Sequence, residues 1–204
     1  MGPRPLLTAA LALAACVAPR PRALTARDYP GALVPVADIA PDFIARQRVV
    51  ATASGRPHGF DAALQRRGDA LTLVGLPPFG ARAFVIEQRG QSVAFTPHLT
   101  RSLPFPPRFI LLDVHRALFM GLPAPHPADG EQRGARDGEE ITERYAGGRL
   151  TERRFRRLDG HPAGEVVVRY DGGMEPPRPP RALTLRNGWL GYELRVETLS
   201  WQAL

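Results

Sequence analysis

The sequence contains no lysine and a single cysteine, Cys16. The absence of lysine excludes Schiff-base chemistry and a P-loop lysine. One cysteine excludes an internal disulfide, so the fold must be held by its core. All 27 basic residues are arginine and the net charge is +7. We attribute most of this arginine to a GC-rich genome; a basic surface would also suit anionic lipid head groups or lipopolysaccharide phosphates.

The chain also lacks an apolar run of the about 20 residues that span a bilayer. Its early apolar run, 6–14, follows the positive residue Arg4 and ends in Leu-Ala-Ala-Cys at Cys16, which resembles a bacterial lipobox. We therefore predict a lipoprotein signal peptide over residues 1–15, cleavage before Cys16 and acylation of that cysteine. The alternative is an ordinary secretory signal in which the cysteine is a coincidence.

An acylated Cys16 would hold the mature protein on a membrane, since each buried CH₂ contributes ~0.8 kcal/mol. The lipobox resemblance brings with it a sorting rule, in which aspartate after the cysteine retains a lipoprotein in the inner membrane. Val17 occupies that position. We therefore expect a lipid-anchored protein on the periplasmic face of the outer membrane, and export argues against nucleic acid as a partner.

Residues 16–40 are rich in proline, alanine and arginine without a sustained period, which predicts a lipidated tether. A folded, ligand-binding domain is expected over 41–204. Short apolar runs separated by Gly- and Pro-containing breaks are typical of antiparallel hairpins. The expected strands are 47–53, 60–67, 70–76, 81–88, 91–96, 140–145, 150–158, 164–170, 181–186 and 190–199.

Helical spacing of apolar residues after two prolines predicts a helix over 108–120. Residues 124–138 are polar and rich in Pro and Gly, which predicts a loop. The strands containing 71–74 and 83–86 are apolar on both faces, so each face needs a cover. The sequence therefore predicts a mainly β (α+β) fold, in which a curved antiparallel sheet forms a half-open barrel around a helix or an apolar cavity.

Two segments, Val-Gly-Leu-Pro-Pro-Phe-Gly at 74–80 and Phe-Met-Gly-Leu-Pro at 119–123, carry a family resemblance. Together with the lipobox, tether, hairpins and helix, they resemble in order the outer-membrane lipoprotein receptor LolB and its periplasmic relative LolA. The closer resemblance is to small LolB-like lipoproteins of unassigned role found with aryl-polyene and fatty-acid-type gene clusters. It covers nearly the whole mature chain.

The resemblance implies a half-open β-barrel with helices closing its mouth and a cavity that accepts acyl chains. It implies a protruding, membrane-inserting loop at Leu76, Pro78 and Phe79, and a periplasmic LolA-like donor as a possible partner. The alternative for Phe79 is that it folds back onto its own hairpin. The strand at 60–67 lacks an expected aromatic cluster and the 124–138 loop is longer and more polar, so the cargo stays open.

Apolar residues of the early strands, the helix and the late strands are candidates to line the cavity, and the alternative for each is ordinary core. The candidates are Leu71, Leu73, Phe84, Ile86, Ile110, Val114, Leu118, Leu183 and Tyr192.

The sequence predicts no catalytic residue, metal site or cofactor. Its five histidines are scattered, and no serine lies in a nucleophile elbow. Asp113 and His115 are two apart on the helix and so point to different faces; we expect His115 on the exposed side or near the cavity mouth. We expect Glu139 and Glu140 to be solvated.

The expected function is therefore a monomeric binder of a hydrophobic ligand, which it accepts, carries or inserts at the outer membrane. The alternatives are a structural or scaffolding envelope lipoprotein and, least favoured, an enzyme that acts on a lipid.

The lipobox yields a direct test. The Cys16→Ala variant should stay soluble or uncleaved in the periplasm, because the acyl acceptor is gone. Membrane fractionation measures this, with the unchanged chain as the control. Continued attachment by an acyl chain would show that the anchor is elsewhere.

Overall fold

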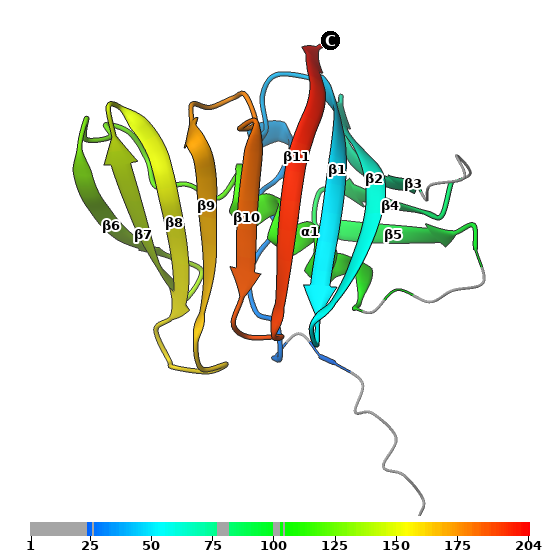
Figure 1. The fold of residues 1–204 in the computed structure, drawn as a ribbon, viewed down its shortest axis with the longest axis horizontal. Helices are drawn as coiled ribbons and strands as arrows, with labels where there is room; N and C mark the ends of the chain where they lie inside the picture. The colour runs from blue at the N-terminus through cyan, green and yellow to red at the C-terminus, as the bar shows by residue number, and fades with distance from the viewer. Residues whose placement is uncertain (1–23, 26, 77–81, 100–102, 104) are drawn as a thin grey trace, which may run out of the picture.

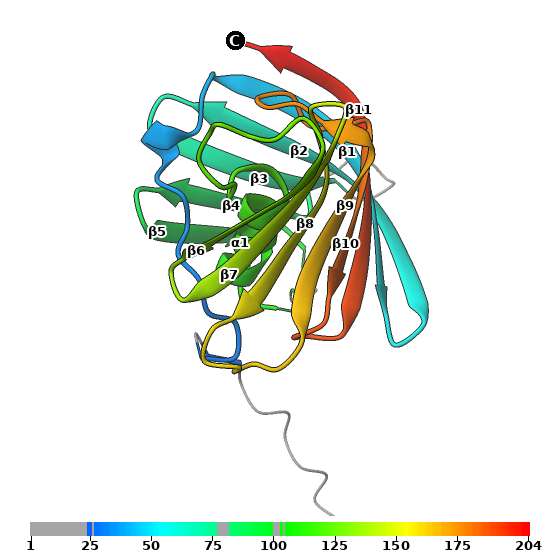
Figure 2. The same cartoon turned by 90° about the vertical axis from the view of Figure 1, so that its left-hand side faces the viewer.

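The computed structural model describes residues 24, 25, 27–76, 82–99, 103 and 105–204. They form one antiparallel sheet of 11 strands in the order β5-β4-β3-β2-β1-β11-β10-β9-β8-β7-β6. The sheet curves strongly around α1, and its edge strands β5 and β6 do not pair with each other (Figures 1 and 2). The expected curved, half-open antiparallel sheet is confirmed.

Every strand expected from the sequence is present, and so is the helix, α1 (Pro107–Leu118). The first half of the sheet contains β1 (Phe43–Ala53), β2 (Arg56–Arg67), β3 (Ala70–Leu76), β4 (Phe84–Arg89) and β5 (Ser92–Pro97). The second half contains β6 (Gly130–Arg136), β7 (Glu139–Ala146), β8 (Arg149–Arg157), β9 (Glu165–Met174), β10 (Ala182–Asn187) and β11 (Tyr192–Ala203). A short 3₁₀ helix, η1 (Val36–Asp38), precedes β1.

The expected loop over 124–138 is wrong in its second half, because residues 130–136 form the edge strand β6 beside β7. Most of this strand is exposed on both faces, so its sequence carries no alternation of apolar and polar residues. Gly134 allows the close approach of Leu122, since a Cβ there would lie 2.6 Å from Leu122 Cδ2.

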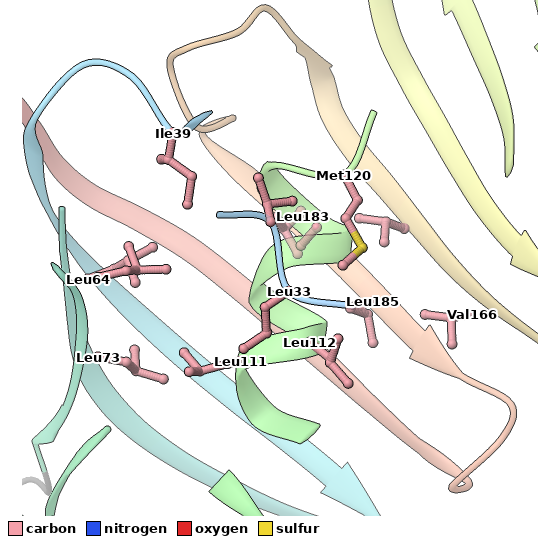
Figure 3. Close-up of a cluster of buried hydrophobic side chains, with 14 of the residues drawn as sticks. Leu33, Ile39, Leu64, Leu73, Leu111, Leu112, Met120, Val166, Leu183 and Leu185 are labelled. Atoms are coloured by element: carbon pink, nitrogen blue, oxygen red, sulfur yellow. The ribbon is translucent and has the colours of Figure 1, made fainter. Parts of the chain in front are cut away.

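The hydrophobic core lies between α1 and the concave face of the sheet. Figure 3 shows Leu111 of α1 on the side of Leu73, and Leu112 on the side of Leu185. Helix and sheet therefore share one core, and α1 covers the concave face, which is one of the two arrangements expected from the sequence.

The N-terminal segment 29–39 differs from the tether expected there, because it packs into the core. Its buried side chains are Tyr29, Leu33, Val34, Val36 and Ile39. Figure 2 shows this segment, in blue, running along the open side of the curved sheet past the edge strands. We call residues 29–36 the N-terminal strap. The apolar residues of the strap cover part of the core that the unpaired edges leave open.

The strap is joined to α1 and to the sheet through a buried ion pair. Arg116 Nη2 of α1 donates to Glu139 Oε1 of β7 at 2.7 Å and to the Pro30 carbonyl at 2.6 Å. Both charged side chains are buried, at 0% and 4% exposure. The expectation that Glu139 is solvated is therefore wrong, whereas Glu140 remains partly exposed and pairs with Arg156. A residue pattern does not show that a distant helix supplies the partner of Glu139.

Arg116→Met should lower the free energy of unfolding by about 3–5 kcal/mol, because it leaves Glu139 buried without a partner. Arg156→Met is the matched control, since it breaks the exposed ion pair between Arg156 of β8 and Glu140 of β7. It should lower the free energy of unfolding by less than about 1 kcal/mol. Urea unfolding measures both. Equal effects of the two variants would contradict the structural role of Arg116.

Candidate functional site

Seven half-buried apolar side chains line the interior beside α1. Ile110, Val114 and Leu118 recur at spacings of four and so share one helix face. We call the full set the apolar strip: Phe60, Phe84, Ile110, Val114, Leu118, Leu194 and Val196.

Strand register places the sheet members of the apolar strip on the concave face. Val49 stands opposite both Val196 and Phe60, and Val196 also stands opposite the buried Leu183. Directly opposed residues share a face of the sheet. Phe60 and Phe84 also contact each other edge to face, with ring centroids 6.5 Å apart.

The helix members of the apolar strip face β1 and β2. Leu118 lines a gap of about 20 Å³ together with Phe43 of β1 and Leu64 of β2. Trp201 of β11 and residues 176–179 of the loop 175–180 also line this gap. Because Ile110 and Val114 lie on the same helix face as Leu118, all three face the same side of the interior.

The nine expected cavity residues fall into two groups. Phe84, Ile110, Val114 and Leu118 keep partial exposure and belong to the apolar strip. The other five are buried in the core: Leu71, Leu73, Ile86, Leu183 and Tyr192. Their role as cavity lining stays a prediction. Phe60, Leu194, Val196 and Trp201 were not among the expected cavity residues. The alternation of apolar and charged residues over 193–197 was a signal for Leu194 and Val196.

The expected loop and anchor residues fall largely outside the described residues. Cys16, Pro78 and Phe79 are not among them. Leu76 is half-buried at the end of β3.

The polar face of α1 binds the strap instead of solvent. Asp113 accepts hydrogen bonds from the hydroxyls of Tyr29 and Tyr192, and Asn187 Nδ2 donates to Tyr29 Oη at 2.7 Å. Burial raises the pKa of Asp113 to about 6, against the stabilising effect of these donors and of Arg116. These hydrogen bonds fix Tyr29, the first residue of the strap, to α1, β10 and β11.

His115 is fully buried, so its expected exposure is wrong. Its Nδ1 accepts the Val34 backbone N–H at 3.0 Å, and its Nε2 lies 2.7 Å from Gln88 Oε1. Gln88 Nε2 in turn donates to the Val34 carbonyl at 2.9 Å. Burial, reinforced by nearby arginines, lowers the pKa of His115 to about 3. The imidazole is therefore neutral, with its proton on Nε2.

Asp113 and His115 have different partners, and neither lies at an opening. Their geometry gives structural support to the strap and no acid–base pair. Within the described ranges, no group of three or more His, Cys, Asp or Glu side chains could hold a metal ion. No helix in the described part of the chain is long and apolar enough to cross a membrane.

His115 makes the fold sensitive to acid. Between its ordinary pKa of 6.5 and about 3, the unfolded chain binds a proton at His115 that the folded chain excludes, so stability falls as pH falls. Asp113 has the opposite effect on stability. Between pH 3.8 and about pH 6 its carboxyl keeps a proton in the folded chain that it has lost in the unfolded chain, so stability rises as pH falls. The variant His115→Asn keeps a hydrogen-bond acceptor near the Val34 N–H and removes the loss of stability at low pH that is caused by His115.

We expect the loss of unfolding free energy between pH 7 and pH 4 to be smaller in His115→Asn, by on the order of 2 kcal/mol. Urea unfolding at both pH values measures it. His161→Asn is the control, because His161 is exposed. The same pH dependence in the wild type and in His115→Asn would refute the assignment.

Solved structures that resemble the chain include the following three. A LolA superfamily protein from Nitrosomonas europaea is 10% identical with a TM-score of 0.47, over 83% of this chain and 90% of that one. A domain from Vibrio parahaemolyticus described as an outer membrane lipoprotein-sorting protein is 11% identical with a TM-score of 0.47, over 79% and 85%. A DUF1329 family protein from Desulfovibrio piger is 10% identical with a TM-score of 0.35, over 81% and 87%.

No curated protein matches the chain at a significant level. A family model described as a protein of unknown function, DUF3261, matches residues 44–200. The match runs from β1 into β11 and so includes α1 and at least part of every strand. The chain therefore belongs to the DUF3261 family.

Proposed function

We propose that the protein is a lipid-anchored envelope protein that binds an apolar ligand, acylated or polyene-type, between α1 and the concave face of its sheet. It accepts, carries or inserts this ligand at the outer membrane. The observation that carries the proposal is the apolar strip, in which apolar side chains from helix and sheet keep partial exposure although they face the interior.

The two sides of α1 have different surroundings: one makes polar contacts with the strap and the sheet, and the other is apolar. Asp113, His115 and Arg116 are buried and fix the helix to the strap and to β7. The helix members of the apolar strip, Ile110, Val114 and Leu118, lie on another face of α1 and make no such polar contacts. Apolar lining with few polar groups suits an acyl chain, which offers no hydrogen bonds.

Ligand binding requires the interior to open. The gap beside Leu118 holds about 20 Å³, which is roughly the room for one water molecule. Residues 176–179 of the loop 175–180 line this gap, and displacement of the loop would widen the gap towards the rest of the apolar strip. Mechanistically, no covalent step is involved, and the ligand moves down a gradient of apolar affinity from a donor to this interior and then to the bilayer.

The anchor and the loop complete the proposal. Acylated Cys16 would keep the domain at the membrane, and an apolar loop at Leu76, Pro78 and Phe79 would lower the cost of the final transfer by entering the bilayer. A periplasmic LolA-like protein is the proposed donor.

A second candidate function is favoured by a different observation. Five of the nine expected cavity residues are buried in the core, as they would be in a scaffold without cargo. A structural envelope lipoprotein would use this fold to hold partners, and its interior would bind no ligand in solution.

Ligand binding can be measured with the Cys16→Ala chain and the uncharged fluorescent probe N-phenylnaphthylamine. Val114→Glu should weaken probe binding at least about tenfold, because it places a charge in the apolar strip. Val114→Leu should retain binding. Leu199→Glu is the matched control, since Leu199 is 41% exposed and lies outside the strip.

Absence of probe binding by the folded wild-type chain would favour the scaffold. Extraction of the Cys16→Ala chain from its own host, followed by mass spectrometry of the copurified lipids, would then identify any natural ligand. An acyl or polyene species bound to wild type and lost in Val114→Glu would support the carrier.

A further inference from the structure

A second concave site lies on the outer side of loop 175–180. The groove there has a volume of about 1050 Å³ and is formed by the end of β9, this loop, and parts of β8, β10 and β11. The loop has the sequence Glu-Pro-Pro-Arg-Pro-Pro. Its four prolines restrict the backbone, so the wall of the groove is stiff.

Four arginines line this groove: Arg149, Arg178, Arg181 and Arg195. None of the four has a carboxylate partner within ion-pair distance among the described residues. Arginines nearby on the same strands are paired, for example Arg154 with Glu152 at 2.6 Å and Arg169 with Glu152 at 2.8 Å. The groove therefore concentrates guanidinium groups that are free to bind an external anion.

Three carboxylates also line the groove: Asp171, Glu175 and Glu197. Four arginines against three carboxylates leave a lining charge of +1. This small excess favours one compact anion over a polyanion such as nucleic acid or a highly charged surface. A single phosphate is well suited, because a guanidinium donates two parallel hydrogen bonds to its oxygens.

The groove and the apolar strip meet at the same loop. Pro176, Pro177, Arg178, Pro179 and Trp201 line both the groove and the narrow gap that contains Leu118. The guanidinium of Arg178 lies over the Trp201 ring, 5.4 Å from its centroid. The buried Trp201 Nε1–H has no acceptor among the described residues, so a ligand oxygen at this boundary would provide one.

We propose that this groove binds the anionic head group of an amphiphile, a phosphate, while its apolar chain passes Trp201 into the apolar strip. The inference rests on the proposed function, because the strip must accept the chain. It adds that the protein selects its ligand by the charge of the head group. Arg178 and Arg181 bind the head, and the loop 175–180 separates head from chain.

Calorimetric titration of the full chain carrying Cys16→Ala tests this inference. The probes are dodecyl phosphate, the neutral dodecyl maltoside, both below their critical micelle concentrations, and inorganic phosphate. We expect dodecyl phosphate to bind more tightly than either of the others. The double variant Arg178→Gln/Arg181→Gln should weaken dodecyl phosphate binding roughly tenfold or more, and should leave dodecyl maltoside binding unchanged.

The matched control is Arg56→Gln/Arg67→Gln, which makes the same change of charge at two exposed arginines on β2, outside the groove. It should leave all three affinities unchanged. Equal affinity for dodecyl phosphate and inorganic phosphate would overturn the inference in favour of a site for free phosphate.

Equal loss of affinity in the two double variants would overturn it in favour of a general charge effect. Binding of dodecyl maltoside with no preference for dodecyl phosphate would refute the head-group site and leave the proposed function standing. If neither amphiphile binds, the proposed function fails as well.

Discussion

The guanidinium of Arg116 lies where α1, the strap and the sheet meet. Because this buried cation has lost its hydration, protein groups must supply an opposite charge and hydrogen-bond acceptors in place of water. Glu139 supplies the charge, and Pro30 supplies a carbonyl. The Tyr29 and Trp189 rings lie with their centroids 4.7 Å from the guanidinium carbon, and such cation–π contacts are stronger when water is excluded. These partners come from three separate segments, the strap, β7 and the turn between β10 and β11. The charge can therefore be buried only when all three are assembled.

This requirement explains how an open sheet has a defined interior. The edge strands β5 and β6 do not pair, and so main-chain hydrogen bonds alone leave the barrel incomplete. The strap covers part of the open side, and it is held by side chains of α1 and by Gln88 and Gln91, which bind the Val34 and Leu33 carbonyls. The helix is fixed from its polar side, and none of these fixing contacts involves a residue of the apolar strip.

The short apolar runs between Gly- and Pro-containing breaks and the helical spacing of α1 are local patterns, and they were enough to predict α1 and every strand except β6. The curvature was predicted from strands that are apolar on both faces. The buried polar residues were not predictable in this way. His115 is neutral and inside because Val34 and Gln88 surround it, and these partners are separated from it by 81 and 27 residues. The strap was missed because its proline and alanine are typical of a tether, whereas its packing depends on Leu33 and Val36 finding a gap in a distant sheet. The groove at 175–180 follows from a Pro-rich loop whose neighbours only the fold brings together.

The position of the strap at the start of the folded chain also constrains the order of assembly. Asn187, which binds the Tyr29 hydroxyl, lies 158 residues further along the chain, and β1 pairs with the last strand, β11. The first folded segment to be synthesised therefore completes its packing only after the final hairpin exists. Folds dominated by such distant contacts form slowly and keep strand edges and apolar surface exposed in the meantime. The same architecture that closes the finished molecule gives the nascent chain a long period in which it needs protection from aggregation.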